Sequence, residues 1–470
     1  MIPPSDFAAR AGAVFEWIDR YLNHVREYPV KSQVQPGEVY GNIPAEAPRT
    51  AEPLERILAD LDNIILPGIT HWQHPNFHAY FPANGSVESL FGEFVTATLG
   101  AQCMIWETSP AAAELEQRMM EWLRQAMGLP ESLEGVIQDS ASSATLAALL
   151  TAREVATGFR SNEDGVPSGL RVYASAEAHS SIEKGMGVAG LGRKNLVKIP
   201  VDARGAMIPE ALKEQIEADR AKGLTPIAVV ACLGTTGTVA VDPLKDIAPI
   251  AKAQGLWLHV DAAFAGSALL LPEYAWMKEG MEDVDSFVFN PHKWLFTHFD
   301  CSVFFVKRAD LLIRTFEILP EYLKTKTRGQ VNDYRDWGVP LGRRFRALKL
   351  WFVIRGFGLE GLQNQLRKHI ELNQYFTQQI EAMPGMELMQ EPFLNFSCFR
   401  LSPPNLPPED RNALNKELLE RVNRDGSLFL THTVLHGAYV LRALMAQTYL
   451  EKDDVDRSLA VLRRISAEFL

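Results

Sequence analysis

The chain has few cysteines, no long apolar run and no leader-like start. Its 470 residues include four cysteines, and none of them forms a CxxC pair. This argues against a disulfide framework or a cysteine-rich zinc site, and no metal ion is expected. No uncharged apolar stretch approaches the ~18 residues that a membrane-spanning helix needs. The opening MIPPSDFAAR carries an early acid and neither a basic nor an apolar region, unlike a signal peptide. We therefore expect a soluble, cytoplasmic protein.

Positive charge is also scarce. Lysine and arginine number 47 against 58 aspartates and glutamates, which gives a net charge of −11. An acidic chain is a poor candidate for binding nucleic acid or an anionic membrane. The 32 glycines and 28 prolines show no period, which excludes collagen-like and low-complexity chains. With 47% hydrophobic residues the chain can bury a large core, and its length suggests about three domains.

The sequence divides into three predicted parts. Apolar residues at helical spacing predict a helix over 5–28 and a shorter one over 54–64, separated by a proline-rich stretch. This opening, 1–85, is a helical arm with too few residues to bury its own apolar faces, so it must pack on something larger. A large domain over 86–360 and a small α+β domain over 361–470 follow. In the small domain we predict helices at 362–383 and 409–423 and short strands near 395–400, 427–431 and 438–443.

The large domain alternates short β-rich runs with helical patterns. Its runs are nearly continuous in apolar residues, which favours a mostly parallel sheet covered by helices on both faces. In such sheets ligands bind beyond the carboxyl ends of the strands. The predicted strands are 172–174, 196–199, 227–231, 256–260, 286–289 and 302–306, and the clearest helices are 144–156 and 209–221.

Two charged residues follow neighbouring strands of this sheet. Asp261 comes directly after one apolar run, and Lys293, in Asn-Pro-His-Lys-Trp, follows the next. Taken singly, Asp261 fits an ordinary helix cap and Lys293 an ordinary surface lysine. Their separation of 32 residues spans one strand–helix–strand unit, so the sheet would bring both to the same edge. A lysine that forms a Schiff base and an aspartate that pairs with a protonated pyridine nitrogen are what pyridoxal phosphate requires.

Three further segments follow strands and fit the same cofactor. The Ser-rich turn 139–145 opens a helix, whose free N–H groups and dipole attract anions, although ordinary capping explains it equally well. His179 precedes a helix that Ser180 and Glu183 are predicted to open as a capping box, and it is either a loop residue or a ring that lies on a flat cofactor. Thr236 lies in a Gly-Thr-Thr-Gly turn that is either plain or part of the same rim.

With these residues in view, the sequence resembles the group II pyridoxal-phosphate-dependent amino-acid decarboxylases, and most of all their aromatic-L-amino-acid decarboxylase branch. The resemblance covers nearly the whole chain, and Asn-Pro-His-Lys-Trp preceded by His-Val-Asp-Ala-Ala is its most specific element. The matching segments are HWQHPNFHAYFP (71–82), SPAAAELE (109–116), DSASSAT (139–145), EAHSS (177–181), LGTTG (233–237), HVDAAFAGSA (259–268), FNPHKW (289–294), FDCS (299–302), PEYLK (320–324) and PLGRRFRALKLW (340–351).

The resemblance implies a fold and an assembly. We expect the fold-type I α/β architecture, in which a mostly parallel seven-stranded sheet is flanked by helices and followed by the small α+β domain. We also expect an obligate homodimer, with the N-terminal arm packed on the partner subunit and the active site at the interface.

The resemblance also assigns roles to individual residues. Lys293 would carry the Schiff base, Asp261 would hold the pyridine nitrogen protonated, and His179 would stack on the ring. Tyr322 would donate a proton to the carbon that loses CO2. The phosphate would be held by Ala141, Ser142, Asn290 and His292, with Thr236 lining the cofactor pocket. The substrate side would be lined by Trp72, Tyr80, Phe81, Pro82 and Gly342.

The function implied is decarboxylation of aromatic L-amino acids, namely Trp, Tyr, Phe, DOPA or 5-hydroxy-Trp, to arylalkylamines and CO2. Gly342 stands where relatives carry Gly or Ser, and Gly goes with acceptance of indoles. An aromatic acetaldehyde synthase, a decarboxylase of an acidic or imidazole amino acid, and an inactive binding protein remain alternatives. Asp139 and Glu107 depart from the family pattern and leave the fine substrate preference open.

Overall fold

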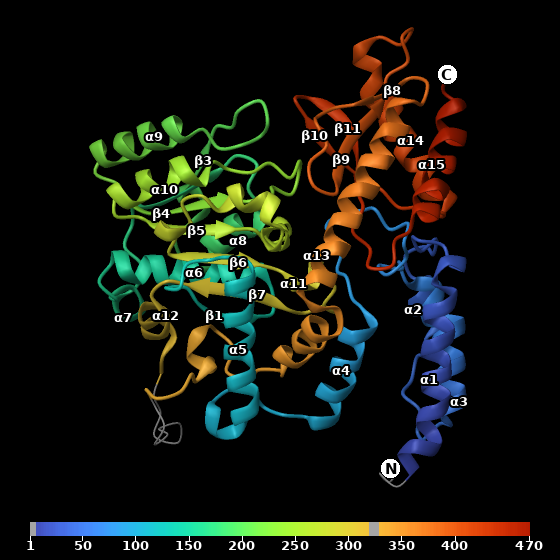
Figure 1. The fold of residues 1–470 in the computed structure, drawn as a ribbon, viewed down its shortest axis with the longest axis horizontal. Helices are drawn as coiled ribbons and strands as arrows, with labels where there is room; N and C mark the ends of the chain where they lie inside the picture. The colour runs from blue at the N-terminus through green and yellow to red at the C-terminus, as the bar shows by residue number, and fades with distance from the viewer. Residues whose placement is uncertain (1–5, 319–328) are drawn as a thin grey trace. The chain divides into compact units, whose positions relative to one another are not determined.

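The computed structural model describes residues 6–318 and 329–470 (Figure 1). The chain forms two compact units, one of residues 83–368 and one that combines 1–82 with 369–470. Within the described residues, no helix is both long and apolar enough to cross a membrane. The three-part division of the sequence, in which the arm is separate from the small domain, stays a prediction.

The unit of residues 83–368 is built on a seven-stranded sheet in the order β1-β7-β6-β5-β4-β2-β3. Four neighbouring pairs are parallel, and β7 runs antiparallel to both of its neighbours. The predicted fold class, a mostly parallel seven-stranded sheet, is confirmed. Its strands are β1 (Glu134–Gln138), β2 (Leu170–Ser175), β3 (Leu196–Ile199), β4 (Thr225–Cys232), β5 (Trp257–Asp261), β6 (Ser286–Phe289) and β7 (Ser302–Val306).

Helices surround this sheet, as Figure 1 shows for the green and teal segments. Several of them connect successive parallel strands, which is the usual way to return the chain to the same end of a sheet. The helices that begin in this unit are α4 (Val87–Leu99), α5 (Pro110–Ala126), α6 (Ala141–Ala156), α7 (Ser161–Asp164), α8 (Ser180–Val188), α9 (Pro209–Ala221), α10 (Leu244–Ala253), α11 (Pro291–Trp294), α12 (Ala309–Phe316) and α13 (Arg346–Glu381).

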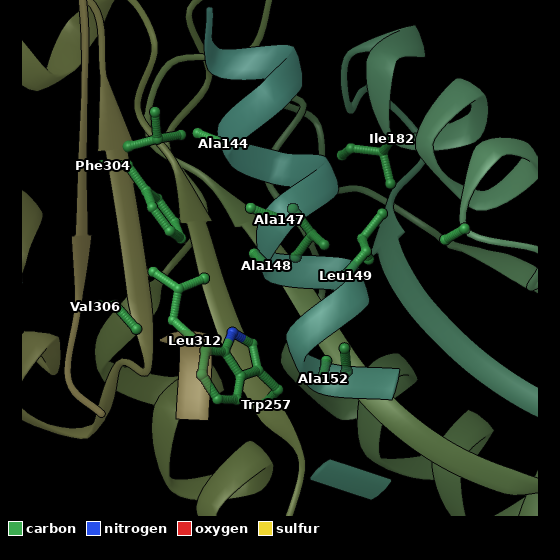
Figure 2. Close-up of a cluster of buried hydrophobic side chains, with 14 of the residues drawn as sticks. Ala144, Ala147, Ala148, Leu149, Ala152, Ile182, Trp257, Phe304, Val306 and Leu312 are labelled. Atoms are coloured by element: carbon green, nitrogen blue, oxygen red, sulfur yellow. The ribbon is translucent and has the colours of Figure 1, made fainter. Parts of the chain in front are cut away.

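Helix α6 lies against the middle of the sheet because its inner face is made of small residues. Ala144, Ala147, Ala148 and Ala152 are all almost completely buried, and Figure 2 shows these alanines on the helix beside strand residues such as Phe304. Small side chains let a helix approach a sheet closely, and the large side chains of the strands fill the remaining space. The close approach places the start of α6 over the carboxyl ends of the central strands.

The second unit joins the N-terminal helices to a four-stranded antiparallel sheet in the order β10-β11-β9-β8. The strand predicted near 427–431 is placed wrongly, because β10 begins only at Thr431. The apolar residues that suggested it are buried for another reason: Phe429 pairs with Phe77 in an isolated bridge. The elements are α1 (Phe7–His24), α2 (Glu38–Asn42), α3 (Leu54–Asp60), β8 (Met386–Leu388), β9 (Phe396–Leu401), α14 (Arg411–Asp425), β10 (Thr431–Leu435), β11 (Ala438–Leu444) and α15 (Lys452–Ala467).

A buried histidine ties the N-terminal segment to this sheet and to α15. His78 lies 3.1 Å from the carbonyl oxygen of Leu444 through Nδ1 and 2.9 Å from the hydroxyl of Ser458 through Nε2. Because a carbonyl only accepts, Nδ1 carries the proton and the Ser458 hydroxyl donates to Nε2. Burial lowers the pKa of His78 to about 4, so the ring is neutral at physiological pH.

We predict that His78 makes the folded chain sensitive to acid. The unfolded state takes up a proton near the ordinary histidine pKa of about 6.5, whereas the folded state does so only near pH 4. The stabilising contribution is therefore complete above pH 6.5 and falls by up to about 3 kcal/mol as the pH drops towards 4.

Urea unfolding at pH 7.5 and pH 4.5 measures the effect. His78→Asn should lose less stability between the two pH values than the parent protein loses. His24→Asn, a change at an exposed histidine of the same unit, is the matched control and should behave as the parent. Equal acid sensitivity of the His78→Asn variant and the parent contradicts the prediction.

Candidate active site

The carboxyl ends of the parallel strands β5 and β6 bring Asp261 and Lys293 into neighbouring segments. Asp261 is the last residue of β5 and is 8% exposed, and its Oδ1 accepts a hydrogen bond from the N–H of Ala263 at 3.0 Å. The carbonyl of Ala263 in turn accepts from the N–H of Asn290 at 3.0 Å, just beyond β6. Lys293 follows on the short helix α11. The backbone N–H of Lys293 donates to the carbonyl of Asn290, and this bond closes the first turn of the helix. The two charged side chains thus extend from adjoining, mutually hydrogen-bonded segments.

Electrostatics link these two residues to a third, His179. Burial lowers the pKa of the Lys293 amine, and the negative charge of Asp261 opposes that shift. Burial also lowers the pKa of His179. The negative charge of Asp261 opposes this shift, and the positive charge of Lys293 adds to it. Each of the three side chains therefore lies within the field of the others. A lysine with a lowered pKa is more often neutral, and the neutral amine is the form that attacks a carbonyl carbon.

His179 is held by the helix that it opens. The predicted capping box of Ser180 and Glu183 is wrong, because His179 itself is the N-cap of α8. Its Nδ1 accepts from the N–H of Ser181 at 3.2 Å and lies 2.8 Å from the Ser181 hydroxyl. Since Nδ1 accepts, the neutral ring carries its proton on Nε2. This fixes a flat, uncharged ring beside Asp261 and Lys293.

The first turn of α6 offers a place for an anion. Ser140 is the N-cap, and its hydroxyl and carbonyl oxygens accept from the N–H groups of Ser143 and Ala144. The N–H groups of Ala141 and Ser142 come first in a helix of 16 residues, and Ser142 is exposed. Early N–H groups and the positive end of the helix dipole favour a phosphate at this position. Asp139 precedes the turn and accepts from the Ser140 hydroxyl at 3.1 Å.

Asn290 and His292 are both buried and oriented by bonds to β7 and the residue before it. The hydroxyl of Ser302 donates to Oδ1 of Asn290 at 2.6 Å, which directs the other end of the amide, the NH2 donor, away from that bond. Nδ1 of His292 accepts from the N–H of Cys301 at 2.9 Å, and burial lowers the pKa of His292 to about 3. Both side chains therefore keep an N–H group for an acceptor such as phosphate oxygen.

Sequence reasoning missed the residues that orient these groups. Ser181 could have been identified from the sequence, because a hydroxyl residue two positions after a polar cap is a common pattern at the start of a helix. Ser302 and Cys301 could not, since they reach Asn290 and His292 only through the antiparallel pairing of β6 with β7.

The other predicted site residues lie elsewhere in the chain. Thr236 is exposed in the turn after β4. The aromatic residues assigned to the substrate side belong to the unit of 1–82 and 369–470, so their place at the site stays a prediction; they are Trp72, Tyr80, Phe81 and Pro82. Within that unit the Trp72 ring stacks on Tyr80 at 5.8 Å between centroids. Tyr322 lies outside the described residues.

Gly342 is exposed and lies beside Gln102. Oε1 of Gln102 accepts from the N–H of Arg343 at 2.8 Å, and a Cβ atom added at Gly342 would lie 3.2 Å from Nε2 of Gln102. A small substituent at this position would therefore press on the end of a flexible side chain. Glu107 is also exposed, in the short helix Trp106–Thr108.

The side chains at this sheet edge fit pyridoxal phosphate in their chemistry. They provide an amine of lowered pKa, a nearly buried carboxylate, a flat neutral imidazole and a helix N-terminus for a dianion. Within residues 6–318 and 329–470, no group of three or more metal-ligating side chains occurs. The donor set is thus that of an organic phosphate cofactor with a reactive carbonyl.

Comparisons with known proteins agree with this site. Residues 36–402 match the pyridoxal-dependent decarboxylase conserved domain. The chain is 41% identical to aromatic-L-amino-acid decarboxylase of Sus scrofa over 483 residues, covering 99% of this chain and 97% of the relative. It is 40% identical to phenylacetaldehyde synthase of Arabidopsis thaliana over 466 residues, covering 97% and 94%. The crystal structure of Oryza sativa TDC with PLP and tryptamine superposes with a TM-score of 0.96 at 34% identity, covering 100% of this chain and 99% of that one.

The likenesses to the two relatives and to the solved structure extend over almost the whole length of both chains. They confirm the fold, the cofactor and the resemblance predicted from the sequence. The chain belongs to the pyridoxal-phosphate-dependent decarboxylases and is a carboxy-lyase of their aromatic and histidine amino-acid group.

Proposed function

We propose that the protein decarboxylates aromatic L-amino acids, namely Trp, Tyr, Phe, DOPA or 5-hydroxy-Trp, to arylalkylamines and CO2. The observation that carries the proposal is the electrostatic cluster of Lys293, Asp261 and His179 at the carboxyl ends of β5 and β6. An inactive relative used only for binding would have no need to keep a desolvated lysine beside a nearly buried carboxylate, since that pair costs stability.

Each residue of the cluster has a distinct proposed task. When bound, pyridoxal phosphate supplies an electron-withdrawing ring that takes up the electron pair left by CO2. Lys293 holds the cofactor covalently through its amine. Asp261 would accept a hydrogen bond from the pyridine N–H and favour the positively charged form of that nitrogen. His179 would stack on the ring and hold the cofactor in its orientation.

The phosphate and the ring rim have their own proposed partners. The N–H groups of Ala141 and Ser142 at the start of α6 bind the phosphate, and the N–H groups of Asn290 and His292 add further donors. Thr236 lines the cofactor pocket from the turn after β4. All of these groups are donors or small side chains, as a dianion and a flat ring require.

The preference for aromatic substrates rests on the segment that carries Trp72, Tyr80, Phe81 and Pro82. The exposed Trp72 ring packs against the exposed Tyr80 ring at 5.8 Å and against the buried Phe77 ring at 4.5 Å between centroids, so the segment presents two adjoining aromatic rings on a buried aromatic base. An apolar wall favours a reaction in which a carboxylate loses its charge. The family pattern at Gly342 adds room for an indole.

Two alternatives within the family have specific support. An aromatic acetaldehyde synthase is one, because a synthase is as similar to this chain as a decarboxylase is. Tyr322, as the proposed donor of a proton to the substrate carbon, and His179 favour the amine product instead. A decarboxylase of an imidazole or acidic amino acid is the other, because a histidine decarboxylase is nearly as similar to this chain. The aromatic segment 71–82 argues against it.

We also propose a homodimer with the active site at its interface. The N-terminal arm exposes large apolar side chains that a single chain leaves in water, among them Phe7, Phe15, Tyr40, Ile43 and Ile57. So many exposed large apolar side chains on one short segment favour a surface that another protein covers. All four cysteines are buried and unpaired, which fits the proposed cytoplasmic location.

We predict that Lys293→Ala abolishes turnover and the covalent attachment of the cofactor. Borohydride treatment of the loaded parent protein, followed by peptide mass spectrometry, should place a reduced pyridoxyl group on Lys293. Lys278→Ala is the matched control, because burial lowers the pKa of the Lys278 amine too, but that amine donates to two backbone carbonyls, those of Met127 and Gly128. A pyridoxyl group on another lysine, or normal activity of Lys293→Ala, would overturn the assignment.

A substrate panel tests the function itself. Amine, aldehyde and CO2 are measured for Trp, Tyr, Phe, DOPA, His and Glu; we predict amine from the aromatic substrates, with Trp accepted. Gly342→Ser should lower kcat/KM for Trp relative to Tyr by about tenfold or more, since one extra group in a substrate pocket changes discrimination by about 1–3 kcal/mol. Gly361→Ser, at a glycine with only ordinary contacts, is the control. Aldehyde as main product, or turnover of His or Glu alone, contradicts the proposal.

A further inference from the structure

A buried histidine, His259, lies between the central sheet and helix α6. It precedes Asp261 by two positions on β5, so both side chains emerge on the same face of the strand. His259 is 1% exposed, and its ring meets the edge of Phe304 at 6.2 Å. Figure 2 shows α6 on this face of the sheet, between Phe304 and the side chains of α8. The ring is therefore enclosed by the sheet and by α6.

Both ring nitrogens of His259 are used. Nδ1 lies 2.9 Å from the hydroxyl of Ser286 on β6, and that hydroxyl also accepts from the indole N–H of Trp257 at 2.8 Å. Nε2 lies 3.2 Å from the hydroxyl of Thr145 on α6. Ser286 and Thr145 are both completely buried. The result is a continuous polar link from β5 and β6 to the second turn of α6, in an otherwise apolar layer.

The two ends of this link lie next to the two ends of the cofactor site. Thr145 is one helical turn beyond Ala141, where the phosphate is proposed to bind. Asp261 is proposed to meet the pyridine nitrogen. Pyridoxal phosphate is a rigid ring with its phosphate and its ring nitrogen at different edges. The separation between α6 and β5 must therefore match the cofactor if both anchors are to bind at once.

We propose that His259 is a positioning residue that fixes the start of α6 relative to Asp261, so that one cofactor molecule engages both anchors. The inference rests on the proposed function, since it takes its two anchors from there. His259 acts through Thr145 and is not a catalytic residue. The apolar contacts that hold α6 on the sheet are non-directional, and a hydrogen bond of defined length and direction adds a constraint on its position along the strands.

The rival explanation is that His259 merely satisfies polar groups in the core. Helix α6 offers a matched control for it. Thr151 is also completely buried, but its hydroxyl donates to the carbonyl of Ala147 within the same helix at 2.8 Å. Thr145→Val and Thr151→Val remove the same hydroxyl from the same helix at equal burial. Only the first breaks the link to His259.

The test compares two ligands on the cofactor-free protein: pyridoxal phosphate, and pyridoxal, which lacks the phosphate. The link matters only for a ligand that spans both anchors. The ratio of the Kd of pyridoxal to the Kd of pyridoxal phosphate should therefore fall about fivefold in Thr145→Val, the effect of one neutral hydrogen bond. The ratio should stay unchanged in Thr151→Val. It should also keep the parent value in Thr145→Ser, because serine retains the hydroxyl. Titration by absorbance, with thermal melting of each apo variant, separates binding from folding.

A second variant keeps the test informative if Thr145→Val folds poorly. His259→Phe removes both ring nitrogens and should lower the same ratio, because it breaks the link from the side of β5. Equal ratios in Thr145→Val and Thr151→Val overturn the inference while leaving the proposed function intact. Failure of the parent protein to form a covalent adduct with pyridoxal phosphate would instead overturn the proposed function.

Discussion

The chemistry of this protein depends on one topological constraint, namely that the parallel strands β5 and β6 end at the same edge of the sheet. The backbone bond from Asn290 to Ala263 joins the two segments directly beyond that edge. Because of this shared edge, Asp261 and Lys293 lie in neighbouring segments of the fold. Helices α6 and α8 begin at the same edge, so their N-termini bring the proposed phosphate site and the His179 ring to it. A parallel sheet thus gathers groups from segments that are far apart in the chain.

The same edge is costly to maintain. Removing a carboxylate and an ammonium from water costs several kcal/mol per ion, and their mutual attraction offsets only part of it. The packing of a sheet whose strands are buried on both faces offsets this desolvation cost. Burial also keeps the surrounding histidines neutral. His259 and His292 have pKa values of about 4 and about 3. These two rings are therefore uncharged at neutral pH, and burial lowers the pKa of the Lys293 amine as well.

The sequence was a good guide where the pattern was strong and local. Strands β6 and β7 and helix α9 have the predicted bounds, because the two strands are nearly continuous apolar runs and α9 has a helical pattern that opens at Pro209. Strand β1 escaped prediction, since it is short and contains Glu134 and Gly135. The residues after β5 and β6 could be selected in advance because parallel strands share an edge.

What the sequence could not supply were the partners of those residues. Ser302 orients Asn290, and Thr145 meets His259, only because strands and helices distant in the chain pack together. No spacing along the chain encodes such a contact. His259 itself was open to prediction, because the alternation of a strand places it on the same face as Asp261. Its role depends on α6, however, and the position of a helix over a sheet is set by packing.

The central claim is that Lys293 and Asp261 share a desolvated site, and the titration of the Lys293 amine tests it most directly. In the cofactor-free protein, the pH dependence of Lys293 acetylation can be followed by peptide mass spectrometry. The account predicts a midpoint below the ordinary lysine pKa of 10.5, and a still lower midpoint in Asp261→Asn, because the charge that stabilises the ammonium is removed. A midpoint at the ordinary value, unmoved by Asp261→Asn, would contradict it.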